Sequence, residues 1–342
     1  MNATVTALIQ HLQTRGTSTV ALLTDANVAA LYPHYWDALE EHFTLLRLVV
    51  PAGESSKSLQ QAELIWRQLL EAQCEKDLFI LNFGGGTVCD LGGFVAATYK
   101  RGVPFANCPT TLLAMIDAAI GGKNGIDMLS VKNCIGTIRQ PDVVLPDDIS
   151  LLQTLPEKEL RSGFGELIKY ALIGSRELFD QIADVKQLRP QDIRPEWIAH
   201  CAEMKRDIVK RDPEDRAMRH LLNFGHTFGH ALESLLAEAG RPVSHGEAVA
   251  LGMLFESRLS ERYNVLSQSE LMCIENLITR HYPIPDLSAN EVNKAMDYML
   301  QDKKNRNGEI NITLLKSIGN AQPDFYVEAD VCAQVLKNRT CF

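Results

Sequence analysis

The stretch LFILNFGGGTVCD at residues 78–90 decides the fold class. Residues 78–83 form a short apolar run that ends at a glycine, a pattern typical of a buried strand. The three glycines that follow allow the backbone to approach a pyrophosphate closely, and amide groups at the start of a following helix can bind it. The spacing differs from G-x-G-x-x-G, so a tight turn between strand and helix explains this stretch equally well.

Two further apolar runs, Thr19–Thr24 and Leu46–Val50, precede this strand and are also typical of buried strands, while Gln60–Gln73 has the spacing of an amphipathic helix. Strands that alternate with helices predict a parallel sheet with helices packed on its faces. Ligands of such sheets bind beyond the carboxyl ends of the strands. The loop Pro51–Lys57 follows the second strand and is therefore a candidate binding segment, although Glu and Lys in a loop are also typical of a solvated surface.

The pattern changes near residue 150. Long amphipathic segments follow, and strand signals nearly vanish until Ile310–Leu315; the expected helices are Glu157–Ile173, Arg194–Arg211, Leu221–Glu238, Glu247–Tyr263 and Gln268–Arg280. The sequence thus predicts two domains, an α/β domain at residues 1–150 and a mainly α-helical domain at residues 151–342. A ligand site is expected between them.

The overall charge limits the possible partners. The chain has 342 residues, with 34 Lys and Arg against 43 Asp and Glu, and a net charge of −9. This acidity argues against nucleic acid or an anionic membrane as the main partner. No secretory signal and no membrane-spanning apolar run is visible. The eight cysteines form no C-x-x-C pair, which favours free thiols in a reducing cytoplasm. An anionic ligand would require cations that gather locally.

Three histidines suggest a metal site. His226 and His230 are spaced i, i+4 and therefore share a helix face, and His245 follows them. Neutral imidazoles from separate elements can hold a divalent metal, and a carboxylate can complete the site. Glu166 and Lys169, spaced i, i+3 in a largely apolar segment, offer either such a carboxylate beside an amine or a structural ion pair. For each histidine taken singly, a surface or capping role is the preferred interpretation.

Several cations lie in apolar or glycine-rich surroundings: Arg101, Lys123, Lys132, Lys205, Arg219, Lys303 and Lys304. Most Lys and Arg side chains merely make a surface soluble, and this reading suffices for each one singly. If they converge, they form an anion pocket in an acidic protein.

Taken together, these residues resemble the 3-dehydroquinate synthase family along nearly the whole chain. The matching blocks include GGGTVCDLGGFVAATYKRG at 84–102, PTTLLAMIDAAIGGKNGID at 109–127, LQTLPEKELRSGFGELIKY at 152–170 and LLNFGHTFGHALE at 221–233. The resemblance implies a Rossmann-like NAD-binding domain, a helical metal-binding domain and a cytoplasmic homodimer. It implies conversion of 3-deoxy-D-arabino-heptulosonate 7-phosphate, a phosphorylated keto acid, into 3-dehydroquinate and phosphate. This second step toward chorismate would use transient oxidation by NAD, phosphate elimination, reduction and internal aldol closure.

The resemblance also implies roles for single residues. The implied ligands of one zinc or cobalt ion are Glu166, His226 and His245. The implied catalytic and substrate residues are Asp117, Lys123, Asn133, Lys169, Lys205, Arg219, Asn223, His230, Lys303 and Lys304, with Arg101 reaching the neighbouring subunit's site. The implied NAD contacts are Asp25, Asn27, Ala52, Gly53, Glu54, Ser55, Ser56, Lys57, Gly85, Gly86, Thr87, Val88, Cys89, Asp90, Thr110, Thr111, Lys123, Lys132, Leu151, Leu152, Gln153 and Thr154. His230 is expected to move a proton, because an imidazole titrates near neutrality.

Other readings stay open. The sequence departs from the family's usual pattern at Cys89, at Ala118-Ala119 and at Gly165, and these departures affect the shape of a pocket rather than its ligands. A sugar-phosphate cyclase acting on another six- or seven-carbon phosphate, a metal-dependent polyol dehydrogenase and a non-catalytic NAD- or metal-binding protein are the alternatives. Lys205, Arg219 and Asn223 together favour a carboxylated substrate.

Overall fold

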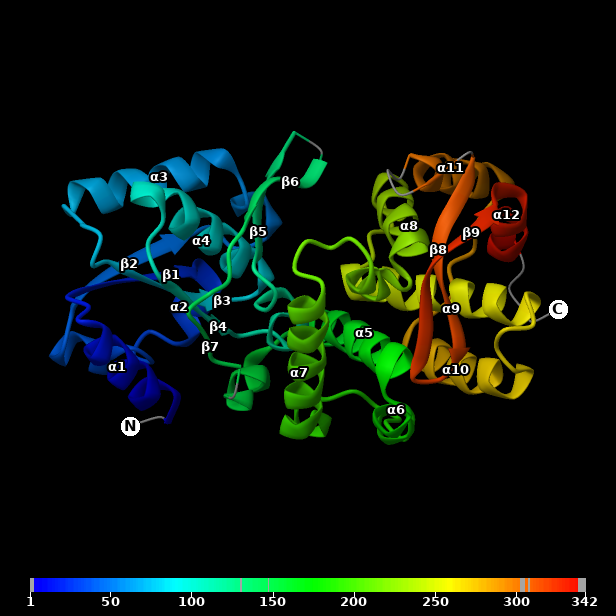
Figure 1. The fold of residues 1–342 in the computed structure, drawn as a ribbon, viewed down its shortest axis with the longest axis horizontal. Helices are drawn as coiled ribbons and strands as arrows, with labels where there is room; N and C mark the ends of the chain where they lie inside the picture. The colour runs from blue at the N-terminus through cyan, green and yellow to red at the C-terminus, as the bar shows by residue number, and fades with distance from the viewer. Residues whose placement is uncertain (1–2, 130, 147, 302–304, 307, 338–342) are drawn as a thin grey trace. The chain divides into compact units, whose positions relative to one another are not determined.

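The chain forms two compact units, Met1–Leu155 and Pro156–Phe342 (Figure 1). The computed structural model describes residues 3–129, 131–146, 148–301, 305–306 and 308–337. The sequence places the division at residue 150, whereas the first unit extends to Leu155. A 3-10 helix, η5 (Ile149–Thr154), joins the first unit because the Tyr32 hydroxyl lies 2.6 Å from Thr154 Oγ1 and donates to the Leu151 carbonyl at 3.2 Å.

A five-stranded parallel sheet forms the centre of the first unit, which confirms the expected α/β class. Its strands are β1 (Thr19–Asp25), β2 (Thr44–Val50), β3 (Phe79–Gly84), β4 (Phe105–Pro109) and β7 (Val143–Val144), in the order β2-β1-β3-β4-β7. β1 and β3 are neighbours, and the chain proceeds outward from them in opposite directions. Their carboxyl ends therefore flank the switch point where such sheets bind ligands. One expectation is wrong in detail: β2 is an edge strand, and Leu46 and Val49 are not buried.

Helices cover both faces of this sheet, as the alternation of strand side chains requires. Ala21 and Leu23 of β1 join a core with helices α3 (Leu59–Glu71) and α4 (Gly86–Thr98). On the other face, His11 of α1 (Ala3–Arg15) contacts the Phe79 ring of β3, with ring centroids 6.0 Å apart. The short helices of this unit are α2 (Ala26–Leu31), η1 (Asp37–Glu41), η2 (Glu54–Ser56), η3 (Tyr99–Arg101) and the π-helical turn η4 (Ala114–Ala118).

An antiparallel hairpin, which the sequence pattern does not predict, follows η4. It consists of β5 (Lys123–Met128) and β6 (Val131–Ile138). Nearly every residue of β6 is exposed, and the apolar side chains of Val131, Ile135 and Ile138 are among them. Because neither face of β6 is covered, its hydrophobic pattern lacks the burial on which strand prediction depends.

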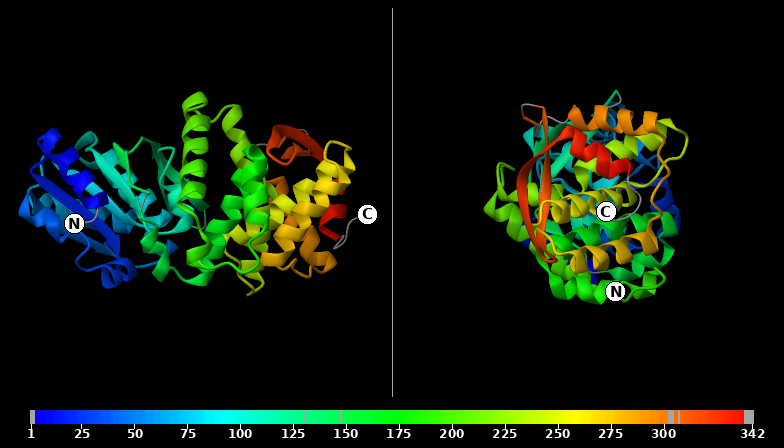
Figure 2. Two further views of the ribbon diagram at one scale, coloured as in Figure 1. Left: turned by 90° about the horizontal axis from the view of Figure 1, so that it is seen from below. Right: turned by 90° about the vertical axis from the view of Figure 1, so that its right-hand side faces the viewer.

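The second unit is mainly helical, as expected. Its helices are α5 (Glu157–Gly174), α6 (Arg176–Ala183), α7 (Pro195–Arg211), α8 (His226–Glu238), α9 (His245–Arg262), α10 (Gln268–His281), α11 (Ala289–Leu300) and α12 (Ala329–Lys337), with 3-10 helices η6 (Pro190–Asp192) and η7 (Met218–Asn223). Residues 248–260 of α9 are all buried, which makes α9 the central helix of this unit. Strands β8 (Glu309–Ser317) and β9 (Asn320–Glu328) form a hairpin on the outside of the helices (Figure 2).

The expected helix Leu221–Glu238 is wrong at its start. Residues 221–223 belong to η7, and α8 begins only at His226. Gly225 separates the two elements because its backbone has a left-handed φ of 80°. Among the described residues, no helix combines the length and the apolar character that a bilayer crossing requires.

Candidate functional site

A carboxylate and two imidazoles converge where three helices of the second unit meet. Glu166 lies in α5, while His226 and His245 are the first residues of α8 and α9. Glu166 Oε1 lies 3.6 Å from His226 Nε2 and 3.4 Å from His245 Nε2. Ligand atoms placed 2.0–2.1 Å from a zinc ion at tetrahedral angles are roughly 3.3 Å apart. The three groups therefore fit one divalent metal ion.

Glycines allow the helices to approach closely enough for this convergence. Gly165 precedes Glu166, and Gly246 follows His245. A Cβ atom on Gly165 would lie 2.1 Å from the Gly246 carbonyl oxygen, and one on Gly246 would lie 1.8 Å from the Ser162 carbonyl oxygen. Any side chain at these two positions would push α5 and α9 apart. The backbone contact thus sets the spacing of the carboxylate and the imidazole.

The outer nitrogens of both imidazoles face acceptors. His245 Nδ1 lies 3.1 Å from Glu233 Oε2, and His226 Nδ1 lies 3.2 Å from the Phe224 carbonyl oxygen. Such partners fix the ring orientation, so that each Nε2 faces Glu166. Burial disfavours the charged imidazole of His245, but the hydrogen bonds to Glu166 and Glu233 outweigh it and raise its pKa to about 9. Burial lowers the pKa of His226 well below its usual value.

His230 lies one turn after His226 on α8 and is exposed. Its ring centroid is 5.3 Å from that of His226 and 5.7 Å from that of His245. One ligand atom from each of the three histidines falls within 4.8 Å of the others. His230 therefore lies within reach of the same centre, but on its solvent side, whereas Glu166 is only 1% exposed.

The second unit also buries three cations, one of which contacts this centre. Lys169 Nζ lies 2.6 Å from Glu166 Oε2, and both side chains are almost fully buried. Lys205 of α7 and Arg219 of η7 are also buried. The turn before Arg219 is organised by Asp212, whose carboxylate accepts backbone N–H groups of Arg216, Ala217 and Arg219 at 2.7–3.0 Å.

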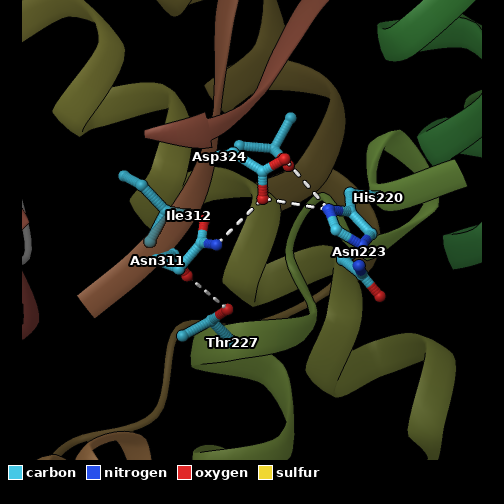
Figure 3. A pocket seen from close by; sticks show the side chains of 7 residues that line it. His220, Asn223, Thr227, Asn311, Ile312 and Asp324 are labelled. Atoms are coloured by element: carbon cyan, nitrogen blue, oxygen red, sulfur yellow. Dashed lines mark hydrogen bonds and ion pairs between the residues drawn. The ribbon is translucent and has the colours of Figure 1, made fainter. Parts of the chain in front are cut away.

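A small polar cavity of about 10 Å³ adjoins η7 and the β8–β9 hairpin (Figure 3). It is lined by His220, Asn223, Thr227, Asn311, Ile312, Thr313 and Asp324. This volume is close to that needed by one water molecule and far below that of a substrate. The cavity is therefore a packing feature beside the cluster, and Asn223 is the one expected site residue that lines it.

In the first unit, the expected NAD-contacting segments follow the carboxyl ends of neighbouring strands. Asp25 ends β1 and accepts the Asn27 and Val28 backbone N–H groups, at 2.9 and 3.1 Å. The loop containing Ala52 to Lys57 follows β2, Gly85 and Gly86 follow β3, and Thr110 and Thr111 follow β4. A Cβ atom on Gly85 would lie 3.0 Å from Thr111 Cγ2, so glycine lets the segments after β3 and β4 approach each other closely.

Lys57 links these segments. Its side chain is 4% exposed, and its ammonium lies 2.9 Å from Asp90, 3.4 Å from Glu54 and 4.0 Å from Asp127. Burial disfavours this charge, but the carboxylates of Asp90 and Glu54 outweigh it and raise the pKa of Lys57. The Thr87 hydroxyl donates to the second oxygen of Glu54 at 2.8 Å. The loop after β2 is thereby fixed to the start of α4.

Four hydrophobic members of the expected NAD set are buried, besides the polar Ser56, Lys57 and Thr110. Val88 and Cys89 of α4 and Leu151 and Leu152 of η5 are at most 2% exposed. Burial raises the pKa of the Cys89 thiol, which keeps it protonated. These four residues can therefore reach a ligand only through their backbone. Gln153 and Thr154 are exposed, while Ser55 is exposed and Ser56 is buried.

The remaining expected residues of the first unit lie at its surface. Arg101, Lys123, Lys132 and Asn133 are exposed, and Asp117 in η4 is half-buried. Lys303 and Lys304 lie outside the described residues. Arg101 has a left-handed φ of 66°, and its neighbours Lys100 and Gly102 also have positive φ. Three successive left-handed residues are a costly conformation of the kind often found at functional sites.

Sequence reasoning missed Glu233, which contacts His245, and three residues at η7 and the β8–β9 hairpin: Asp212, His220 and Asp324. The helical spacing offered a signal for Glu233, because it follows His226 by seven residues and His230 by three on one helix face. No sequence signal points to Asp324, because its contact with His220 joins residues about a hundred positions apart.

Comparison with known proteins identifies the family. Residues 47–162 match the model of the 3-dehydroquinate synthase N-terminal region, and residues 163–305 match that of the C-terminal region. The chain is 39% identical to 3-dehydroquinate synthase from Acinetobacter baumannii over 319 residues, which covers 90% of this chain and 87% of that protein. It is 43% identical to the enzyme of the same name from Dehalococcoides mccartyi over 279 residues, or 80% and 76% of the two chains.

A solved structure shares the whole fold. The 2-epi-5-epi-valiolone synthase from Streptomyces hygroscopicus, with NAD⁺ and Zn²⁺ bound, superimposes with a TM-score of 0.81 and 26% identity over 94% of this chain and 91% of that one. Both family models together span most of the sequence, and the relatives match across both units. The chain belongs to the 3-dehydroquinate synthase family.

Proposed function

We propose that the chain converts 3-deoxy-D-arabino-heptulosonate 7-phosphate into 3-dehydroquinate and phosphate, as a carbon–oxygen lyase that uses NAD and one divalent metal. The observation that carries the proposal is the convergence of Glu166, His226 and His245 at 3.4–3.6 Å in a chain that is about 40% identical to 3-dehydroquinate synthases over most of its length. When bound, NAD accepts and returns a hydride, and the metal ion acts as a Lewis acid toward the substrate hydroxyl.

Glu166, His226 and His245 are the proposed metal ligands, and His230 is not. Glu166 is buried between the two imidazoles, while His230 is exposed. Three protein ligands leave positions open for the substrate, as a catalytic zinc or cobalt site requires. Replacing any of the three by alanine is expected to abolish both metal retention and activity. Full activity of such a variant after chelator treatment would remove that residue from the set.

The proposed NAD site lies at the carboxyl ends of β1 to β4. The amides at the start of α4 and the glycines Gly85 and Gly86 suit a pyrophosphate. Asp25 and Glu54, at the ends of β1 and β2, are placed to accept hydrogen bonds from ribose hydroxyls. The solved relative that binds NAD⁺ has the same fold.

The buried cations suit the two anionic groups of the substrate. Lys169, Lys205 and Arg219 lie in the second unit with little exposure, where a cation pairs strongly with phosphate or carboxylate. Asn223 can donate and accept hydrogen bonds beside them. His230, on the solvent side of the histidine cluster, is the proposed proton carrier. Normal turnover of a His230→Ala enzyme would end that role.

A homodimer is part of the proposal. The left-handed turn at residues 100–102 holds Arg101 at the surface, which suits a side chain that serves a neighbouring subunit. The exposed apolar residues Val131, Ile135 and Ile138 on β6 suit a surface that a second chain covers. A cytoplasmic location fits the seven described cysteines, none of which forms a disulfide.

Phosphate release tests the function. Purified protein, NAD and zinc or cobalt are incubated with the heptulosonate phosphate, and inorganic phosphate is measured. We expect continuous phosphate release without accumulation of reduced nicotinamide, because each turnover returns the hydride. Release only from a six-carbon sugar phosphate that lacks a carboxylate would favour another cyclase. Reduced nicotinamide that accumulates with a simple polyol would favour a dehydrogenase.

A further inference from the structure

Asp324 and His220 form an ion pair that the proposed reaction does not use (Figure 3). His220 Nδ1 lies 3.0 and 2.9 Å from the two carboxylate oxygens of Asp324, and His220 Nε2 lies 3.1 Å from the Asp215 carbonyl oxygen. Only a doubly protonated imidazole donates at both nitrogens. Burial disfavours that charge, but the hydrogen bonds to Asp324 and Asp215 outweigh it and raise the pKa of His220.

The backbone at Asp324 is distorted in a way that directs this side chain. Ile312 pairs with Phe325 and Leu314 pairs with Gln322, so β9 holds one residue more than β8 between these pairs. Asp324 lies in this bulge with a left-handed φ of 58°. Bulges redirect side chains beside functional sites, and aspartate is among the few residues that adopt a left-handed φ.

The pair fixes the segment that carries two proposed substrate residues. His220 belongs to η7 and lies directly after Arg219 and three residues before Asn223. Asp324 also accepts a hydrogen bond from Asn311 Nδ2 at 2.9 Å, and the Asn311 carbonyl accepts one from Thr227 Oγ1 at 3.0 Å. Thr227 immediately follows His226. One network therefore connects the hairpin to η7 and to the first turn of α8.

We propose that Asp324 and His220 are positioning residues that hold η7 so that Arg219 and Asn223 meet the carboxylate of the substrate. This inference rests on the proposed function, because Arg219 and Asn223 are substrate residues only under that function. Neither Asp324 nor His220 needs to touch the substrate. The substrate carboxylate does not take part in the reaction. Contacts with it therefore stabilise the bound substrate and the transition state equally, and their loss raises KM more than it lowers kcat.

Variants of matched shape separate positioning from folding. Asp324→Asn keeps the size of the side chain and tolerates the left-handed φ, and His220→Gln removes the charge. Asp180→Asn is the control, because it deletes the carboxylate of another ion pair in this unit, with Arg176 at 2.8 Å on the surface of α6. Thermal unfolding and zinc affinity are measured for all variants to confirm that each is folded and holds its metal.

The Asp324 side chain is 38% exposed, so water weakens the pair. We expect Asp324→Asn and His220→Gln each to raise KM for the heptulosonate phosphate about fivefold. We expect the double variant to match a single one, since the two residues act together. We expect kcat and zinc affinity of these variants to stay near the wild-type values. We expect the Asp180→Asn control to keep the wild-type KM as well. An unchanged KM, or a fall in kcat that follows zinc loss, would overturn the proposal.

A second background shows whether Asp324 acts through Arg219. In an Arg219→Lys enzyme, adding Asp324→Asn is expected to raise KM by a smaller factor than in wild type, because only Asn223 still depends on the position of η7. An undiminished effect would contradict the inference. Side-chain ¹⁵N NMR of His220 reports the pair without activity: Asp324→Asn is expected to lower the pKa of the ring relative to wild type, and an unchanged pKa would contradict the pairing. If the wild-type enzyme releases no phosphate, the proposed function fails, whereas wild-type turnover with an unchanged variant KM rejects only the positioning role.

Discussion

Replacing Gly246 by alanine tests whether the contact between α5 and α9 sets the geometry of the proposed metal ligands. The new Cβ atom would lie 1.8 Å from the Ser162 carbonyl oxygen, whereas ordinary contacts begin at 3.4 Å. The obstacle is backbone, so no side-chain rotation can relieve it. Gly246 adjoins His245, and separating the helices widens the 3.4 Å gap between His245 Nε2 and Glu166 Oε1.

The size of the effect follows from the overlap. Crowding a well-packed core costs about 1–3 kcal/mol. Without metal the two helices can move apart and relieve the strain. A bound metal ion tolerates deviations of only about 0.2 Å in its ligand distances, so binding must restore the crowded contact. The strain is then subtracted from the binding free energy, and we expect the zinc Kd to rise about tenfold or more.

The assay is a competitive titration of metal-free protein with zinc and a chelator of known affinity. Gly174→Ala is the matched control, because it places the same methyl group on α5 against the flexible end of Met204, at 2.6 Å from Sδ. We expect this control to keep the wild-type zinc Kd. A folded Gly246→Ala protein whose zinc Kd equals that of wild type would refute the view that the glycine contact sets the ligand spacing.

Three further outcomes are expected. Glu233→Gln should weaken zinc binding by roughly tenfold, because a neutral amide orients His245 less firmly, whereas Glu238→Gln on the same helix should not; equal affinities would contradict this. Backbone N–H groups lower the pKa of Asp212 to about 2, so the ionised carboxylate stabilises the fold above its ordinary pKa of 3.8, and this stabilisation disappears as the pH falls toward 2. In urea unfolding, the difference in free energy of unfolding between wild type and Asp212→Asn should therefore shrink between pH 3.8 and 2. A constant difference would argue against this role of the carboxylate. Arg101→Ala should be inactive alone but partly rescued when mixed with inactive His245→Ala subunits, and a lack of rescue would count against a shared site.

The sequence predicts helices and strands well where the hydrophobic pattern matches the burial of the element. The strands at Thr19–Thr24 and Leu78–Phe83 are confirmed because apolar runs bounded by glycine or aspartate are buried on both faces. The β5–β6 hairpin and β9 escape prediction, because β6 is almost wholly exposed and β9 is buried at only one residue. The break at Gly225 is also not predicted, since apolar spacing continues across it. The close approach of α9, which leaves no room for a side chain there, is visible only in the tertiary structure.

The candidate site shows the same division. Helical spacing predicts that His226 and His230 share one face and that Glu166 lies beside Lys169, and the 2.6 Å pair confirms the second. Spacing within a helix says nothing about which helix faces which. The approach of Glu166 to His245, and of Asp324 to His220, depends on backbone contacts between segments far apart in sequence, which only tertiary structure reveals.

The distribution of charge explains how an acidic chain can hold a substrate with two anionic groups. The net charge is −9, yet the described buried residues of the second unit include Lys169, Lys205 and Arg219. At physiological ionic strength, charges more than about 8 Å away are largely screened, so a bound anion responds mainly to its immediate neighbours. Burial lowers the local dielectric constant and strengthens those few contacts. Under the proposed function, affinity for the anion would therefore depend on a small number of buried cations and on the backbone contacts that hold them in place, and not on the net charge of the surface.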